Sequence, residues 1–526
     1  MACANGERQA AVAPAARSVA PALRLVAITD LSGYLAPCGC QSRPLGGIDK
    51  AAWKLAQLRA DGVPTLFVSA GDLLFGDRPE GSSDASESLM QETWRAETLL
   101  GALERLGLAA ATPGARDLEN GGPVFRKLAE QAHVRWLPRD TDPSGSAVAS
   151  WVAPVGGLKI GVVGASSFSG AESDLEPARV TQLGAALQKQ VDAVRAQQAD
   201  VVVALLSTPA RAGRRIVSGL RGVDFVVQGG VVDAAAPPPS RVGQSFVLRA
   251  SRHGHGLLVV DLYPRRGAPF VDVSEWTRRS QIDAQQARVD ELQARVSAWA
   301  KDPSVDPNDL AEQRKKLESL RAELGQLRAR PAANGGGTFD ARFEELGPEI
   351  KPEAQVTALL EAYDARVNAH NKVAFAAVLP KPAPLGTAHY VGAQACKSCH
   401  EAAYAWWQTH PHGNAYATLT KRHKEFNLSC VGCHVTGYGK PGGSTVVHNE
   451  GLVNVGCESC HGPGSVHVAH PERTGAQIIT RDPTQETCRQ CHTPEHSDLF
   501  AFAEFRKRLL VPGHGLPAPA PVGPKP

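Results

Sequence analysis

The segment Cys457-Glu-Ser-Cys460-His461 holds two cysteines three positions apart and a histidine directly after the second. Three more motifs of this form lie in the last quarter of the chain: Cys396-Lys-Ser-Cys399-His400, Cys430-Val-Gly-Cys433-His434 and Cys488-Arg-Gln-Cys491-His492. This is the spacing of covalent c-type haem attachment. The two cysteines reach the two vinyl groups of one porphyrin, and the histidine then lies under the iron as the proximal ligand. The sequence therefore predicts four c-type haems.

Zinc ribbons and disulfides are the alternative interpretations of these cysteines. A zinc ribbon pairs two Cys-x-x-Cys knuckles, and zinc binding gives no reason for a histidine after every second cysteine. Four complete motifs between residues 396 and 492 favour haem iron, and no second metal is predicted.

Length and charge limit the kind of protein. A chain of 526 residues is expected to form about three domains. Its net charge of +3 argues against a nucleic-acid-binding surface. No run of eighteen apolar residues occurs, so no membrane-spanning helix is predicted.

The haem motifs also predict a location, because covalent haem attachment takes place outside the cytoplasm. We expect the chain in the periplasm or at the cell surface of a bacterium, although it shows no secretory signal. Cys3 and the Ala- and Pro-rich stretch up to Pro21 resemble the mature end of an outer-membrane lipoprotein, with a lipid anchor at Cys3. The alternative is that Met1-Ala2-Cys3 is an incidental start.

The fold class expected is multidomain, α/β plus α. Short apolar runs such as 65–70 and 200–206 alternate with helical patterns such as 92–106, which is typical of a buried sheet flanked by helices. The predicted segments are a flexible tether (1–22), an α/β sandwich (23–275), an antiparallel helical hairpin (276–330), a connecting helix and linker (331–385), a mainly helical and irregular tetrahaem domain (386–515) and a disordered tail (516–526).

The hairpin prediction rests on heptad spacing between residues 282 and 327. The apolar positions are Ile282, Val289, Leu292, Val296 and Trp299, and then Leu310, Leu317, Leu320, Leu324 and Leu327. Two such segments suit antiparallel helices. Three roles stay open: a spacer, an arm for self-association through 282–327, or a local packing element.

A second axial ligand is needed for a low-spin haem, and it is usually histidine or methionine. Met90 is the only methionine besides the first residue, so two histidines are predicted for every six-coordinate iron. The histidines of the haem domain outside the motifs are His389, His410, His412, His423, His448, His467, His470, His496 and His514.

The residues between the motifs narrow this choice. They are Tyr390-Val-Gly, Trp406-Trp407, His412-Gly-Asn-Ala-Tyr416-Ala-Thr-Leu419, Cys433-His-Val-Thr-Gly437, Val455-Gly-Cys-Glu-Ser-Cys-His-Gly-Pro-Gly464 and Cys491-His-Thr-Pro494. Over 389–515 this order resembles the cytochrome c-554 family of tetrahaem cytochromes. The resemblance implies electron transfer between redox partner proteins, three haems with two histidines each and one five-coordinate haem.

By position, the resemblance implies distal ligands at His412, His467 and His514, and it leaves the haem of His434 as the candidate open iron. Such an iron would bind a small nitrogen or oxygen ligand, which makes an oxidoreductase the first alternative function. The competing ligands are His410 for His412, His470 for His467, and His423 or His448 for the open iron. His389 and His496 are expected at the surface.

The N-terminal part resembles a second family. The matching stretches are Leu25-Val-Ala-Ile-Thr-Asp30, Gly46-Gly47-Ile48, Phe67-Val-Ser-Ala-Gly71-Asp72 and Thr112-Pro-Gly-Ala-Arg-Asp117. They resemble calcineurin-like metallophosphoesterases of the 5′-nucleotidase branch over 23–265. That resemblance implies a two-metal hydrolytic site, which needs a tight cluster of Asp, Asn and His.

The metal ligands of that family are mostly replaced in this chain. Asp30 and Asp72 are kept, whereas the other expected ligands are Ser32, Ala115, Arg116, Ser207 or Thr208, and Gly229-Gly230-Val231-Val232. We therefore expect a non-catalytic domain for docking or ligand binding, with a metal-dependent phosphoesterase or nucleotidase as the second alternative. Arg116 is expected either to bind an anion or to pair with Asp72 or Asp30.

Two small motifs stay open. Cys38-Gly39-Cys40 is either a redox-active or metal-binding pair or two structural thiols. His253-Gly254-His255 is either a ligand to a metal or haem or part of a turn.

Overall fold

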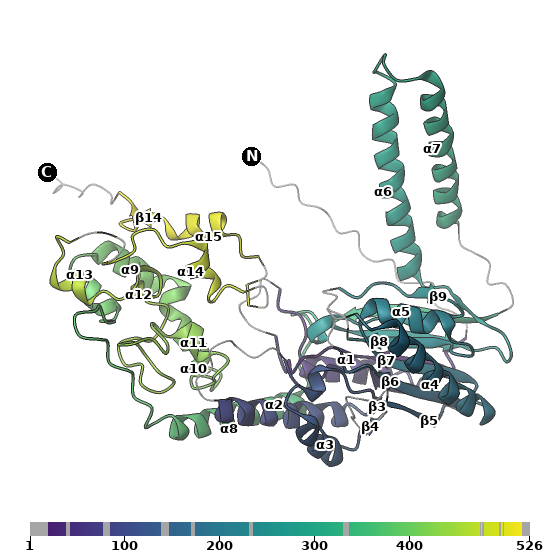
Figure 1. Cartoon of the computed structure of the whole chain (residues 1–526), viewed down its shortest axis with the longest axis horizontal. Coiled ribbons are helices and arrows are strands. Elements are labelled where there is room, and N and C mark those ends of the chain that lie inside the picture. The colour runs from purple at the N-terminus through teal and green to yellow at the C-terminus, as the bar shows by residue number, and fades with distance from the viewer. Residues whose placement is uncertain are drawn as a thin grey trace. The chain divides into compact units, whose positions relative to one another are not determined.

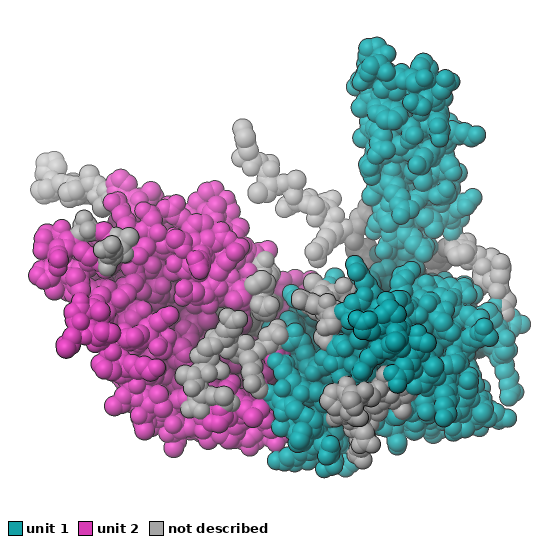
Figure 2. All heavy atoms as spheres, in the orientation of Figure 1, with its two compact units in different colours: residues 1–34, 51–75, 103–346 teal, residues 35–50, 76–102, 347–526 magenta. Residues whose placement is uncertain are grey.

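Two compact units make up the protein (Figure 2). Unit 1 comprises residues 1–34, 51–75 and 103–346, and unit 2 comprises residues 35–50, 76–102 and 347–526. The computed structural model describes residues 19–37, 43–76, 85–137, 147–169, 174–230, 235–329, 336–473, 475, 478–493, 496–497 and 499–517. The predictions for Cys3, Cys38, Cys40 and residues 231–232 lie outside the described residues.

Unit 1 contains two β-sheets (Figure 1). The seven-stranded sheet has the order β12 (Phe270–Asp272), β13 (Gly337–Glu345), β11 (Gly256–Tyr263), β1 (Leu23–Ala27), β2 (Thr65–Ser69), β3 (Leu108–Ala111) and β4 (Arg135–Trp136). The six-stranded sheet has the order β5 (Ala147–Val155), β6 (Leu158–Ser166), β7 (Val201–Ser207), β8 (Phe225–Gly229), β10 (Ser245–Leu248) and β9 (Ser240–Val242).

The main hydrophobic core lies between these sheets. Alternate side chains of each strand meet there, such as Leu25 of β1 and Val203 of β7. The intervening Val202 points to the opposite face of its sheet, beneath α4 (Pro177–Ala196) and α5 (Ala210–Gly219). The predicted α/β sandwich is confirmed. Its remaining helices are α1 (Ile48–Arg59), α3 (Gly122–Gln131), η1 (Arg116–Leu118) and η2 (Arg252–Gly254).

The predicted helical hairpin consists of α6 (Glu275–Trp299) and α7 (Pro307–Arg328). Its apolar side chains pack against one another within the hairpin: Ile282, Val289, Leu292, Val296, Leu310, Leu317, Leu320 and Leu324. The chain then returns to the seven-stranded sheet as β13, which pairs antiparallel with β11. The strand β13 is absent from the predicted elements, which placed residues 331–385 in a connecting helix and linker, although Phe339, Ala341 and Phe343 alternate with polar residues as in a half-buried strand.

Unit 2 combines long helices with a region of short elements. The long helices are α2 (Ala85–Arg105), which belongs to this unit as far as Ala102, and α8 (Ala354–Ala374). The short elements are η3 (Ala393–Cys396), α9 (Glu401–Thr409), η4 (Pro411–Asn414), α10 (Ala415–Thr420), α11 (Val431–His434), α12 (Cys457–His461), α13 (Ser465–Ala469), α14 (Gln485–Arg489), α15 (Phe502–Leu509), β14 (Val511–Pro512) and β15 (Gly515–Leu516).

This haem-motif region, residues 386–515, buries very few apolar side chains. Among its described residues the buried hydrophobic ones are Ala393, Leu419, Val431, Val435 and Val446. So small a core would not stabilise a chain of this length without another apolar component. Among the described residues no helix has the length and apolar character needed to cross a bilayer.

A buried arginine connects β1 to its neighbours in unit 1. Arg24 is 4% exposed, and its Nε lies 2.6 Å from Oδ1 of Asp261. Its Nη2 lies 2.9 Å from Oδ2 of Asp61. Asp261 has a second cation, because Nη1 of Arg342 lies 2.7 Å from its Oδ2.

We expect Arg24→Met to lower the free energy of unfolding of unit 1 by about 3 kcal/mol, because it removes one partner of a buried ion pair. Denaturant titration followed by far-UV circular dichroism measures this loss. The matched control is Arg279→Met, whose exposed pair with Glu275 should change the free energy by less than about 1 kcal/mol. Equal losses of unfolding free energy in the two variants would contradict a stabilising role for the buried ion pairs of Arg24.

Candidate functional site

Three pairs of imidazole rings face one another in the haem-motif region. The ring centres of His400 and His467 are 6.3 Å apart, those of His412 and His492 are 6.1 Å apart, and those of His461 and His514 are 6.1 Å apart. Each pair joins one motif histidine to one histidine that the family resemblance implies as a distal ligand. The two rings of each pair come from separate parts of the chain, and the fold brings them together.

These separations fit an iron between the two rings. An iron held by two imidazoles needs about 6 Å between ring centres, because each metal–nitrogen bond is about 2 Å and each nitrogen lies roughly 1 Å from its ring centre. The residues present therefore fit the haem group that the motifs imply.

The outer nitrogens of the rings are held as expected for metal ligands. Nδ1 has a hydrogen-bond partner in four of them: the carbonyl oxygen of Ala415 for His434 at 2.7 Å, of Thr480 for His461 at 2.6 Å and of Leu509 for His514 at 2.6 Å, and Oγ of Ser497 for His492 at 2.9 Å. Such bonds fix the tautomer and leave Nε2 for a metal. In His467, by contrast, Nδ1 is buried without a hydrogen-bond partner, as expected of a polar atom that lacks its ligand.

The competing histidines have other partners. Nδ1 of His410 accepts from the backbone N–H of His412 at 3.2 Å, and its ring packs on Trp406 at 4.6 Å. His470 is exposed and pairs with Glu472 at 3.5 Å. Both observations favour His412 and His467 as the ligands.

The histidine of the second motif has no such facing ring. Among the described residues no imidazole is placed opposite His434 as in the three pairs. His448 is directed elsewhere, because its Nε2 lies 2.8 Å from the carbonyl oxygen of Ala376. The remaining histidines of the region are exposed: His389, His423 and His496.

Cysteines of different motifs lie beside one another. A hydrogen bond that the Cys396 thiol donates to Cys457, together with burial, raises the pKa of Cys396, and η3 contacts α12 at this point. Cys433 has the same effect on the pKa of Cys491. Burial, with a smaller contribution from Cys488, raises the pKa of Cys460 to about 11. The attachment sites are therefore neighbours in space.

Glu458 joins the first and third motifs. It is 3% exposed, and its carboxylate accepts from the backbone N–H groups of Gly392 and Gly464, each at 2.7 Å. The sequence analysis did not single it out, because it occupies a variable position of its motif. The only signal was a carboxylate in a segment otherwise expected to be buried.

In unit 1, the retained phosphoesterase-type carboxylates serve the backbone. Oδ1 of Asp30 accepts from the N–H of Gly230 at 2.9 Å, and Oδ1 of Asp72 accepts from the N–H of Arg116 at 2.8 Å. Burial raises the pKa of Asp72, whereas this N–H and the charge of Arg116 oppose the rise. The nearness of that charge favours the ion-pair role of Arg116 over anion binding.

A third carboxylate of this site is occupied in the same way. Asp117 accepts from the N–H groups of Leu73 and Leu74 at 2.8 Å and from that of Gly114 at 2.7 Å. Burial and the nearby Asp72 carboxylate raise its pKa to about 7. Within the described residues, which leave out 231–234, no group of three or more His, Cys, Asp or Glu is placed to hold a metal.

The His253-Gly254-His255 motif lies beside Asp30 and Tyr34. His253 stacks on Tyr34 with ring centres 3.8 Å apart, and its N–H donates to the carbonyl of Asp30 at 2.8 Å. The ring of His255 lies 6.0 Å from that of His253. This arrangement suits a turn.

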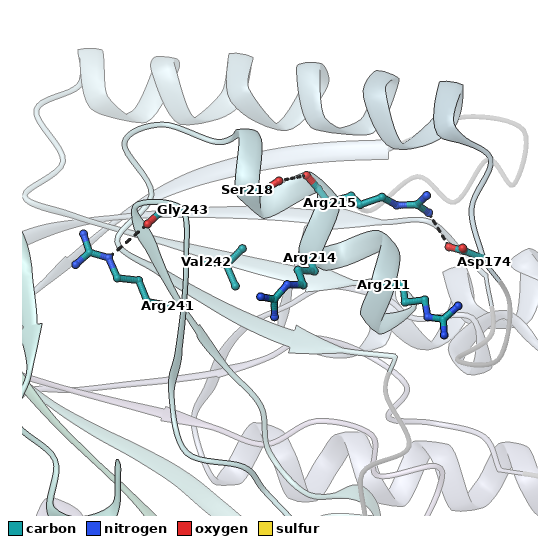
Figure 3. A pocket seen from close by; sticks show the side chains of 8 residues that line it. All are labelled: Asp174, Arg211, Arg214, Arg215, Ser218, Arg241, Val242 and Gly243. Atoms are coloured by element: carbon teal, nitrogen blue, oxygen red, sulfur yellow. Dashed lines mark hydrogen bonds and ion pairs between the residues drawn. The ribbon is translucent and has the colours of Figure 1, made fainter. Parts of the chain in front are cut away.

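A shallow basic pocket, which the sequence analysis missed, lies on the outer face of the six-stranded sheet (Figure 3). Its volume is about 510 Å³, and it is lined by Asp174, Arg211, Arg214, Arg215, Ser218, Arg241, Val242 and Gly243. Arg215 pairs with Asp174 at 2.6 Å. The labelled arginine side chains fan outward and do not converge on one point.

The haem-motif region is similar to known c-type cytochromes, a class whose cofactor is haem iron. The sequence model of the family "Cytochrome c554 and c-prime" matches residues 395–462. Cytochrome c-554 of Nitrosomonas europaea is 37% identical over 93 residues, which are 15% of this chain and 40% of that protein. The chain thus spans less than half the length of this relative.

Solved structures similar to the chain include nucleotidases, a calcineurin-like phosphoesterase and a sulfate thiohydrolase. A 5′-nucleotidase precursor from Thermus thermophilus has a TM-score of 0.41 at 16% identity, with 66% of this chain and 59% of that chain covered. A calcineurin-like phosphoesterase from Bacillus subtilis has a TM-score of 0.39 at 13% identity, covering 66% of this chain and 97% of that one. A sulfate thiohydrolase from Thermus thermophilus has a TM-score of 0.41 at 15% identity, covering 68% and 62%.

Removing one distal imidazole should change one haem only. We expect each of His412→Ala, His467→Ala and His514→Ala to convert one low-spin iron to high spin, because the motif histidine then remains as the only axial imidazole of that iron. Electron paramagnetic resonance of the oxidised holoprotein counts the irons in each spin state. The controls are His410→Ala and His470→Ala, which should leave the counts unchanged. A loss of low-spin iron in a control would reassign the ligand.

Proposed function

We propose that this chain is an exported tetrahaem c-type cytochrome that transfers electrons between redox partner proteins. The observation that carries the proposal is the set of three facing imidazole pairs at 6.1–6.3 Å. Bound haem would supply one-electron chemistry, with iron cycling between Fe(III) and Fe(II). The motif cysteines would attach each porphyrin, and paired histidines would hold the irons in a low-spin state.

The neighbouring cysteines suggest an order for the four attachment sites. Cys396 adjoins Cys457, which relates the first motif to the third. Cys488 is near enough for its charge to contribute to the raised pKa of Cys460, which relates the third to the fourth. Cys491 and Cys433 relate the fourth to the second. We infer that the haem sites follow one another in space in the order first, third, fourth and second motif, with the haem of His434 at one end.

We propose a docking or ligand-binding role for the α/β part rather than catalysis. The support is that Ser32, Ala115 and Arg116 stand where a two-metal site would need Asn or His ligands, while Asp30, Asp72 and Asp117 each accept a hydrogen bond from the backbone. For the α6–α7 hairpin we favour a spacer over self-association, because its apolar side chains already cover one another. Periplasmic or cell-surface location and a lipid anchor at Cys3 belong to the same proposal.

The proposed lack of catalysis can be tested with nucleotides as substrates. Purified protein incubated with nucleotides and Mn²⁺ or Zn²⁺ should release no phosphate above the level of a metal-only blank. Phosphate release that is lost in Asp72→Asn would restore the phosphoesterase as the function of this part.

A second candidate function is an oxidoreductase that acts on a small nitrogen or oxygen ligand. The observation that favours it is His434, whose Nδ1 is fixed by the carbonyl of Ala415 while no described imidazole faces its ring. This arrangement would leave one side of the iron for an exogenous ligand.

Ligand stoichiometry tests this candidate. The wild-type holoprotein should bind one equivalent of nitric oxide per chain, seen as a Soret shift that saturates at one of four haems. In His412→Ala the count should rise to two, because a second iron is opened. A wild-type protein that binds none would exclude chemistry at the His434 haem and leave electron transfer as the function.

A further inference from the structure

Helices α2 and α8 are held together within unit 2 (Figure 1). Nε2 of His370 on α8 lies 2.7 Å from Oε2 of Glu87 on α2. The guanidinium of Arg366 lies over the ring of Trp94 at 3.9 Å, and the ring of His370 meets Trp94 edge-on at 5.1 Å. The two helices therefore act as one support, although one precedes the α6–α7 hairpin and the other follows it.

A buried network of amides connects this support to the loop before the second haem motif. Gln91, Asn371 and Asn427 are 4%, 1% and 6% exposed. Nδ2 of Asn371 donates to Oε1 of Gln91 at 3.0 Å, and Nε2 of Gln91 donates to Oδ1 of Asn427 at 3.0 Å. Oε1 of Gln91 also accepts from the N–H of Leu428 at 3.2 Å. Buried amides with these partners fix a single arrangement.

One face of α8 extends the same contact. Asp364, Asn368 and Asn371 are spaced by four and three residues, so they share a side of the helix. Asp364 pairs with Lys424 at 3.2 Å, and Oδ1 of Asn368 accepts from the N–H of Phe426 at 3.1 Å. The support thus holds residues 424–428 at several points.

This loop sets the start of the second motif. The carbonyl of Asn427 accepts from the N–H groups of Cys430 and Val431, each at 2.9 Å, and so begins the turn that carries His434. Any movement of residues 424–428 would therefore displace Cys430 and the turn that carries His434.

We propose that α2 and α8 are part of the second haem site, with Gln91 and Asn371 as positioning residues for Cys430 and His434. The physical reason lies in the ligands. A haem between two facing imidazoles is held by two parts of the chain, whereas His434 has no described ring opposite it. The carbonyl of Ala415 holds Nδ1 of His434 from within the haem-motif region, and the amides of α2 and α8 add support from outside it through residues 424–428. This inference rests on the proposed function, because it presumes haem at that motif.

The test uses the full-length holoprotein with Gln91→Leu, which keeps the side-chain volume and removes all three hydrogen bonds of the amide. We expect the reduction potential of one haem to shift and the high-spin signal of that haem to change, with the three low-spin signals unchanged. We also expect the dissociation constant for cyanide to change on the order of fivefold, the effect of about one hydrogen bond.

Two further variants separate positioning from folding. Asn368→Ala alters a partly exposed contact to the same loop, so the protein should fold normally and show a smaller shift at the same haem. Gln188→Leu is the matched control, because this exposed glutamine bonds to Asp192 and Arg221 within unit 1. It should leave all four haems unchanged.

The outcomes distinguish the two claims. Purified protein without covalent haem would overturn the proposed function. Four haems whose potentials are all unchanged in folded Gln91→Leu would overturn this inference alone. Equal shifts of all four haems would also overturn it, since they would show a general loss of structure.

Discussion

The proposed haem sites depend on three pairs of histidines whose ring centres are 6.1–6.3 Å apart, the separation that an iron between the two rings would need. With five buried hydrophobic side chains among its described residues, the haem-motif region has little core of its own. Four covalent porphyrins would supply the missing apolar surface, and the axial bonds would tie distant parts of the chain to one another. In this account, the axial histidines and the porphyrins would stabilise the haem-motif region, as apolar packing stabilises unit 1.

The four motifs differ in how they are held. Three histidines have a ring opposite them, and Glu458 ties the entry of the first motif to the third. The second motif instead receives its support from Gln91 and Asn371 on helices outside the region of sequence similarity. In the proposed order of haems, the haem of His434 is both the one open to a ligand and the one whose motif is supported by the long helices α2 and α8. The carboxylates of unit 1, by contrast, have become backbone acceptors.

Local patterns in the sequence were sufficient for some of these features. Cys-x-x-Cys-His spacing indicated the attachment sites, and heptads indicated the α6–α7 hairpin, whose residues pack as expected. Contacts between distant segments left no such signal. The alternation of Phe339, Ala341 and Phe343 with polar residues marks β13 as a strand, whereas its pairing with β11 is visible only in the fold. The spatial order of the motifs depends on which cysteines the fold brings together. The amide network joins Gln91, Asn371 and Asn427, which lie too far apart in the chain for a helix or strand pattern to connect them.

The central claim concerns where the irons lie, and anomalous scattering at the iron edge of a holoprotein crystal tests it most directly. Our account predicts four iron positions. Three lie midway between His400 and His467, His412 and His492, and His461 and His514, and the fourth lies beside His434 next to the iron of the fourth motif. Fewer than four irons, a different pairing of histidines, or an iron of the second motif distant from that of the fourth would contradict it.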